Sequence, residues 1–150
     1  MTAGAAAAPM FVWPLRVYWE DTDGGGVVYH ARYVHFFERA RSEWLRSLGF
    51  HQLELQQQHD LVFAIRAMNL EFVAPARMDD ALQVSVSLLA AGRASLRFVQ
   101  HIHRQPDELI ASATVYAACL TASSFKPRRI PAAMLQRIAE AVPATATENP

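Results

Sequence analysis

The residues best suited to chemistry lie close together, in the segment from Arg16 to His30. Its sequence is Arg-Val-Tyr-Trp-Glu-Asp-Thr-Asp-Gly-Gly-Gly-Val-Val-Tyr-His, so an acidic cluster is followed directly by three glycines. Glycine has no Cβ atom, so the backbone can adopt a positive φ there and lie against a ligand. A carboxylate at such a turn could attack a carbonyl carbon as a nucleophile or act as a base toward water. The segment therefore predicts a site for attack on a carbonyl group.

A helix is expected to begin at about His30, immediately after the glycines. The first backbone N–H groups of a helix have no intrahelical acceptor and lie at the positive end of its dipole. They could hold the negative charge that develops on a carbonyl oxygen. We expect the His30 side chain itself to be neutral and to orient or donate a hydrogen bond, since a helix start disfavours an imidazolium. The alternative interpretation is a solvated acidic loop with a glycine-rich entry to the helix and no chemistry.

Hydrophobic periodicity predicts the elements that would position this site. Leu15, Val17 and Trp19 alternate on one side of an expected strand that ends at the acidic cluster. A largely buried helix follows, and Gly49 is a natural stop for it. Its apolar stripe consists of Tyr33, Phe37, Ala40, Trp44 and Leu48, widened by Val34, Phe36 and Leu45.

Four strands are expected after the helix, with no helix between them. A polar stretch from His51 to Asp60 is either a short helix or an irregular connection. The expected strands span residues 61–73, 82–88, 94–103 and 109–121, the first of them broken near Arg66 and Asn69. This order predicts the α+β class, with an antiparallel five-stranded sheet wrapped around one long central helix. Because a one-layer sheet leaves a face or an edge uncovered, we expect a dimer or higher oligomer.

Composition restricts the class of protein. The chain has 150 residues, with 14 basic and 14 acidic side chains, which argues against a nucleic-acid binder with a dominant basic field. One cysteine, Cys119, excludes an intrachain disulfide, fits a reducing cytosol and is interpreted as a small core residue. No apolar run approaches the roughly 20 residues of a membrane span. We expect a disordered leader at 1–10, one domain at 11–141 and a disordered tail at 142–150.

Two groups of side chains suggest metal binding only weakly. His101 and His103 share one face of an expected strand, but no third ligand is apparent. Glu20, Asp21 and Asp23 lack the further oxygen ligands that a Mg²⁺ site needs. No serine-hydrolase elbow, Walker loop or dinucleotide-binding glycine motif occurs. We therefore expect neither a metal nor a cofactor.

The segment from Asp21 to Ala31, together with helix positions after it, resembles the signature of hotdog-fold acyl-CoA thioesterases. The resemblance is to the 4-hydroxybenzoyl-CoA thioesterase family and, within it, to the acyl-CoA thioesterases associated with the Tol-Pal system. It extends from about Trp13 to Arg129. Its further residues are Tyr33, Phe36, Glu38, Ala40, Arg41, Glu43, Leu45, the segment Phe72 to Arg77, Asp79, Asp80 and the segment Lys126 to Arg128.

The resemblance implies roles for particular residues. Asp23 would be the catalytic carboxylate, with the helix start at Tyr29 and the His30 N–H polarising the thioester carbonyl, and Gly25 and Gly26 lying against the substrate. Independently of the resemblance, Glu38 lies on the side of the expected helix that carries Val34, Arg41 and Leu45, so it could face inward in a catalytic, substrate-binding or orienting role, or else pair structurally with an arginine. Lys126 and Arg128 would contact the CoA nucleotide, or else form a solvated basic loop. Two departures from the family are Trp19, where tyrosine is frequent, and Gly24, where alanine or proline is frequent.

The resemblance also implies partners and leaves alternatives open. It implies an acyl-CoA substrate, a homotetramer or dimer, and a cytoplasmic protein that is either free or peripheral to the inner membrane. Acyl carrier protein is an alternative acyl donor. A dehydratase, or a module that binds acyl-CoA or acyl carrier protein without hydrolysing a thioester, would share the fold. A binding module for the Tol-Pal machinery is a further alternative, and the preferred acyl chain is left open.

Overall fold

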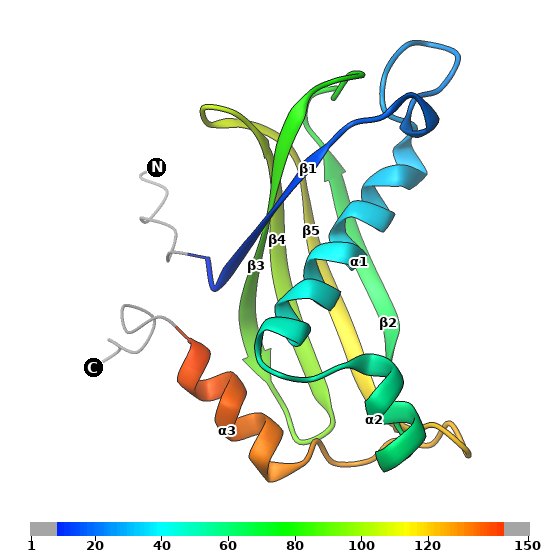
Figure 1. Ribbon diagram of the computed structural model, residues 1–150, viewed down its shortest axis with the longest axis vertical. Coiled ribbons are helices and arrows are strands. Elements are labelled where there is room, and N and C mark those ends of the chain that lie inside the picture. Colours follow the sequence, from blue (N-terminus) through cyan, green and yellow to red (C-terminus); the bar gives the residue numbers. More distant parts are fainter. Residues whose placement is uncertain (1–8, 143–150) are drawn as a thin grey trace.

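The computed structural model describes residues 9–142, in which one long helix packs against one face of a five-stranded sheet (Figure 1). The helix is α1 (His30–Ser47), and the strand order in the sheet is β1-β3-β4-β5-β2 with every neighbouring pair antiparallel. The strands are β1 (Phe11–Arg16), β2 (Leu61–Phe72), β3 (Ala81–Ala91), β4 (Ser95–Arg104) and β5 (Glu108–Thr121). The predicted α+β class and antiparallel sheet are confirmed.

Helix α1 buries the apolar stripe that its periodicity predicts. Its buried residues are Tyr33, Phe36, Phe37, Ala40, Arg41, Trp44 and Leu45. They face core side chains of the sheet such as Val84 and Ile102, both 0% exposed. Gly49 ends the helix with a φ of 92°, and its N–H donates to the Arg46 carbonyl at 2.9 Å. Cys119 is fully buried in the core, as predicted.

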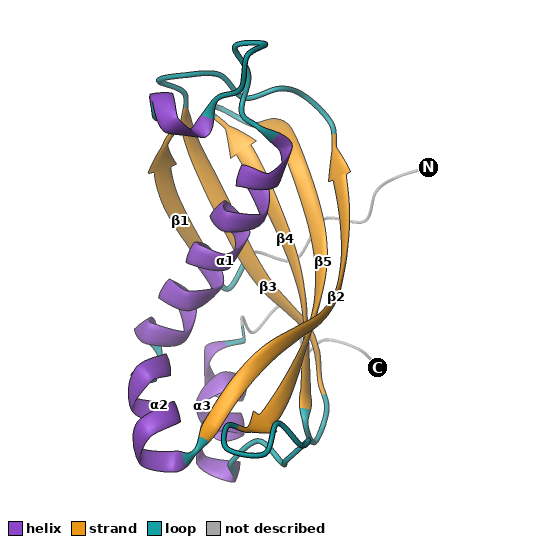
Figure 2. Cartoon of the chain, turned by 90° about the vertical axis from the view of Figure 1, so that its right-hand side faces the viewer, coloured by secondary structure: helices purple, strands orange, loops and turns teal. Residues whose placement is uncertain are grey.

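Strand β2 forms one edge of the sheet and pairs only with β5 among the described residues (Figure 2). Its register shifts between Ile65 and Ala67, which confirms the predicted break near Arg66. The predicted break at Asn69 is wrong, because Asn69 pairs with Thr114 in the regular register. The free edge and the exposed side chains of β2 leave this strand available for pairing with another chain.

Two short helices cover the end of the sheet at which β2 begins (Figure 1). The stretch after α1 forms α2 (Gln52–His59), which settles the open choice between a helix and an irregular connection. Helix α3 (Ala132–Ala141) buries Met134 and Ile138. No helix among residues 9–142 is long and apolar enough to cross a membrane. Residues 1–8 of the expected leader and 143–150 of the expected tail lie outside the described part of the chain.

The chain departs from the predicted strand just before the acidic cluster. Strand β1 ends at Arg16, and residues Trp19–Asp21 form a short 3-10 helix, η1. Val17 is fully buried, but Trp19 is 78% exposed. The expectation that Trp19 shares a face with Leu15 and Val17 is therefore wrong. Period-2 alternation applies only to extended backbone, and the tight turn of η1 directs Trp19 into solvent.

Candidate active site

The two aspartates of the loop after β1 lie in opposite environments. Asp21 is only 4% exposed, and its Oδ2 accepts a hydrogen bond from the Tyr18 N–H at 2.8 Å. Its Oδ1 lies 3.5 Å from the Arg32 Nε atom. Its carbonyl oxygen accepts from the Tyr29 N–H at 2.9 Å, directly before α1. The Asp21 carboxylate therefore holds the loop to the start of the helix, and its burial leaves it little exposed to a substrate.

Asp23, two residues later, is exposed and holds only one hydrogen bond through its carboxylate. Its Oδ1 accepts from the Gly25 N–H at 2.7 Å. No other residue in the described range 9–142 donates to this carboxylate, so Oδ2 faces solvent. Because the Gly25 bond sets the direction of the side chain, Asp23 presents a fixed and accessible carboxylate oxygen.

The loop that carries Asp23 closes back on itself before α1. The Asp23 N–H donates to the Val27 carbonyl at 2.9 Å, and Thr22 pairs with Val28 in an antiparallel bridge. Gly26 has a φ of 79°, a conformation that side chains disfavour. This closure brings the carboxylate of Asp23 to the same end of the molecule as the helix start.

The start of α1 supplies the N–H groups that the sequence predicts. Tyr29 is the N-cap residue, and its carbonyl accepts from the Arg32 N–H at 2.8 Å. The His30 N–H has no backbone acceptor among the described residues, so it is open to a ligand. The His30 ring packs against the Tyr29 ring, with 4.5 Å between centroids, and meets the edge of Phe72 at 6.5 Å. Asp23, Gly25, Gly26, Tyr29 and His30 thus lie in one short stretch at the end of the molecule where α1 begins.

The turn between β2 and β3 holds the loop before α1 in place. The Val28 N–H donates to the Ala76 carbonyl at 2.8 Å, and Val27 pairs with Arg77 in an antiparallel bridge. The Ala76 N–H in turn donates to the hydroxyl of Tyr33 on α1 at 3.2 Å. Burial is the main cause that raises the pKa of the Tyr33 phenol, so this hydroxyl stays protonated near neutral pH.

Arg104 at the end of β4 clamps that turn. Its Nη1 donates to the Pro75 carbonyl at 3.1 Å and to Asp80 Oδ2 at 2.6 Å, and its Nε donates to Glu108 Oε2 at 2.8 Å. These charged hydrogen bonds raise the pKa of the Arg104 guanidinium. Sequence reasoning missed the support by Asp21, Arg32 and Arg104. The acidic pair at 79–80 was a partial signal, but no local pattern connects Arg104 to a loop so distant in the chain.

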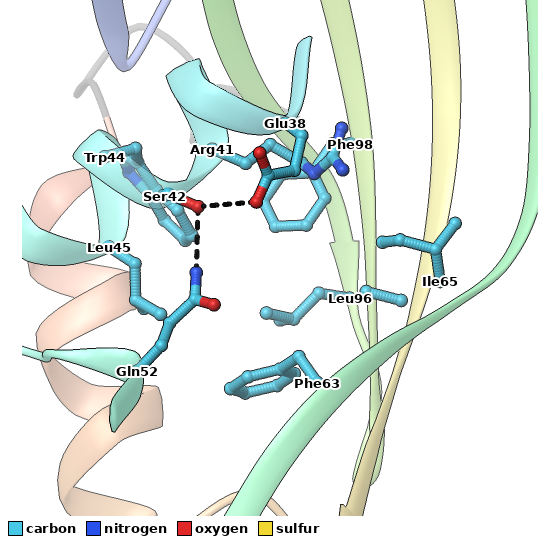
Figure 3. A pocket seen from close by; sticks show the side chains of 11 residues that line it. Glu38, Arg41, Ser42, Trp44, Leu45, Gln52, Phe63, Ile65, Leu96 and Phe98 are labelled. Carbon is cyan, nitrogen blue, oxygen red and sulfur yellow. Dashed lines mark hydrogen bonds between the residues drawn. The ribbon is translucent and has the colours of Figure 1, made fainter. Parts of the chain in front are cut away.

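Three residues that the sequence assigned to substrate binding lie away from the Asp23 loop. Glu38 is exposed on α1, two turns beyond His30, where it borders a separate cavity (Figure 3). Lys126 and Arg128 follow β5, at the end of the sheet opposite to the Asp23 loop (Figure 1). Arg128 is partly engaged there, because its Nη1 donates to the His59 carbonyl at 2.8 Å. One chain alone does not bring these residues to Asp23.

The weaker metal candidates gain no ligands from the fold. The rings of His101 and His103 lie on one face of β4 with 6.0 Å between centroids. Desolvation is the main cause that lowers the pKa of His101. Within residues 9–142 no group of three or more His, Cys, Asp or Glu side chains is placed to hold a metal ion.

Comparison with known proteins finds a family profile, related sequences and a solved structure that match this chain. The profile of the thioesterase superfamily matches residues 25–111. The chain is 44% identical over 122 residues to the acyl-CoA thioester hydrolase YbgC of Escherichia coli O6:H1, covering 81% of this chain and 90% of that protein. It is 42% identical over 121 residues to the acyl-CoA thioesterase YbgC of Haemophilus influenzae, covering 81% and 88%. The crystal structure of a probable thioesterase from Bartonella henselae is similar, with a TM-score of 0.76, 37% identity, and coverage of 80% and 98%.

Proposed function

Because the chain belongs to the thioesterase superfamily, we propose that the Asp23 loop and the start of α1 form the active site of an acyl-CoA thioester hydrolase. The enzyme, a hotdog-fold protein, converts an acyl-CoA and water to a free carboxylic acid and CoA. The observation that supports the site is that the loop before α1 presents an accessible carboxylate oxygen on Asp23, and that the helix start presents an open N–H at His30. Asp21 supplies no competing accessible carboxylate, because it is buried and held by the Tyr18 N–H and by Arg32.

The geometry supports separate roles for His30 and Asp23 in the reaction. The thioester carbonyl oxygen accepts from the His30 N–H, where the helix dipole stabilises the negative charge that forms in the transition state. Asp23 acts on the carbonyl carbon in one of two ways. As a nucleophile it forms a mixed anhydride, releases the CoA thiolate and is then freed by water; as a general base it removes a proton from the attacking water. Tyr29 orients the entry to α1 and packs against the His30 ring.

Purified protein is expected to release free thiol from acyl-CoA thioesters in the presence of a thiol-reactive dye. A series of short aliphatic, long aliphatic and aromatic acyl groups will show which acyl class the pocket accepts. The same acyl groups on acyl carrier protein provide the comparison for the alternative donor. Absence of thiol release with every acyl group on both carriers would contradict the proposed activity and favour a binding module on this fold.

We further propose that the site is completed in a homo-oligomer. The β2 edge is free, and Ile65, Phe72 and Val73 on and beside it are 44%, 53% and 57% exposed. Pairing of two such edges would cover apolar surface and satisfy unpaired backbone groups. It would also allow Lys126 and Arg128 of one chain to approach the Asp23 loop of another, which they do not reach within their own chain. In this arrangement Lys126 and Arg128 contact the phosphates of CoA.

Replacing Lys126 with Gln is expected to raise KM for acyl-CoA severalfold and to change kcat little. Phosphate contacts far from the carbonyl are equally strong in the ground and transition states, so they affect binding alone. Lys126 is the better test of the pair, because Arg128 also holds the His59 carbonyl. Arg39→Gln, an exposed charge removed from α1, is the matched control. An equal loss on acyl-pantetheine, which lacks the nucleotide, would show that Lys126 has a structural role instead.

A further inference from the structure

A cavity lies along α1, separate from the Asp23 loop. Its volume is about 150 Å³, and it opens between α1, the first turn of α2 and the sheet (Figure 3). Its walls are mainly apolar, with Leu45, Phe63, Leu96 and Phe98 among them. Apolar cavities of roughly this size can bind a molecule as large as benzene.

One buried cation borders this otherwise apolar cavity. Arg41 is 8% exposed, and its Nη1 donates to the Gln100 Oε1 atom at 2.9 Å. Gln100 is fully buried, and its Nε2 donates to the Phe37 carbonyl at 3.1 Å, so its oxygen is held toward the guanidinium. Burial is the main cause that lowers the pKa of Arg41 to about 10, which leaves it cationic at neutral pH.

The charge of Arg41 has no carboxylate partner in the described chain. A charged guanidinium carries five N–H donors, and only one of those of Arg41, on Nη1, has an acceptor among residues 9–142. The negative charge of Glu38 raises the pKa of Arg41, but the two form no ion pair. Glu38 is exposed at the mouth of the cavity, where its Oε1 accepts from Ser42 Oγ at 3.3 Å (Figure 3). Burying a charge against a single neutral amide is costly unless a further acceptor reaches it.

We propose that this cavity binds a small apolar carboxylic acid, with the carboxylate hydrogen-bonded to the open side of the Arg41 guanidinium. A planar guanidinium binds a carboxylate through two parallel N–H···O bonds, and the walls of Phe63, Leu96 and Phe98 accept the apolar body of the acid. Free acids of this class are the products of the proposed hydrolysis. Binding of the acid does not depend on that activity, whereas a role in holding product rests on the proposed function.

Titration calorimetry with benzoate and hexanoate, against the neutral benzamide and hexanamide, tests the proposal. The full-length protein is expected to bind each carboxylate at least about tenfold more tightly than its amide, since a charge-assisted pair is lost in the amide. Arg41→Met is expected to abolish this preference, and Arg39→Met on the exposed face of the same helix is expected to preserve it. Equal affinity for acid and amide in the unmodified protein would overturn the proposal.

A second variant addresses the cavity without altering the buried guanidinium. Ala117 on β5 borders the cavity, and Ala117→Leu would place additional methyl groups inside it. This variant is expected to weaken the binding of benzoate and of benzamide by similar factors. The result shows whether the ligands occupy this cavity even if Arg41→Met does not fold. Unchanged benzoate binding in Ala117→Leu would place the acid elsewhere and overturn the proposal. Because binding is measured without acyl-CoA, failure here is distinguishable from absence of thioesterase activity.

Discussion

Replacement of Asp23 with Asn is expected to lower kcat for acyl-CoA hydrolysis by roughly 10²-fold to 10⁴-fold, the range that a positioned acid–base group contributes. The amide keeps the shape of the side chain, and its oxygen can still accept from the Gly25 N–H that Asp23 Oδ1 binds at 2.7 Å. It cannot act as a base, and it is a far poorer nucleophile. Thiol release and thermal unfolding on the same preparation measure the effect, and the melting temperature should remain close to that of the unmodified protein.

Asp21→Asn is the matched control, because the same chemical change is made two residues away in a bonded carboxylate. Loss of the charge facing Arg32 at 3.5 Å in a site only 4% exposed should reduce the free energy of unfolding by about 1 to 3 kcal/mol. The main effect of Asp21→Asn is therefore on stability, and that of Asp23→Asn on turnover. Full activity in Asp23→Asn would remove Asp23 from the mechanism. A burst of thiol in the first turnover would favour the nucleophile over the general base.

Gly25→Ala is expected to produce the second large loss, about tenfold or more in kcat, because small displacements of reacting groups cost rate steeply. A Cβ atom at Gly25 would lie 3.2 Å from Asp23 Oδ1, closer than ordinary van der Waals contact. The same oxygen accepts the Gly25 N–H, so the carboxylate must shift by a few tenths of an ångström to relieve the contact. Steady-state kinetics on the best acyl-CoA of the series measures the loss.

The neighbouring glycines provide the controls for Gly25→Ala. A Cβ atom at Gly24 would meet nothing within 4 Å, and Gly24 has no positive φ, so Gly24→Ala should retain activity. Gly26 has a φ of 79°, so Gly26→Ala should cost about 1 kcal/mol or more in stability. Equal kinetic losses in Gly24→Ala and Gly25→Ala would contradict the assigned position of the Asp23 carboxylate.

The local sequence pattern alone was sufficient to predict the features of the chain that depend on residues close in sequence. Helix α1 begins at His30 and ends before Gly49 as predicted, because helical periodicity and a glycine stop act over a few residues. The glycine turn after Asp23 was also readable, since no side chain fits a close backbone approach there. The antiparallel order of the last strands followed from short connections without intervening helices.

Tertiary structure alone decided which of the loop carboxylates is open. Asp21 and Asp23 are the same residue type in one acidic cluster, and only the contacts of Asp21 with Tyr18 and Arg32 separate them. The sequence pattern also placed Trp19 on the wrong side, because a 3-10 turn replaces the extended backbone that alternation assumes. Neither distinction is encoded in spacing, since each depends on which groups the folded chain brings into contact.

The longest-range features were decided in the same way. Arg104 reaches the turn between β2 and β3 through Pro75 and Asp80, and Arg41 meets Gln100 from the opposite layer of the core. The end of the sheet at which Lys126 lies follows from the direction of β5, which carries the chain away from the Asp23 loop. A residue's neighbours along the chain determine its helix or strand, but the partners of a buried charge are set by packing between elements, which no local period records.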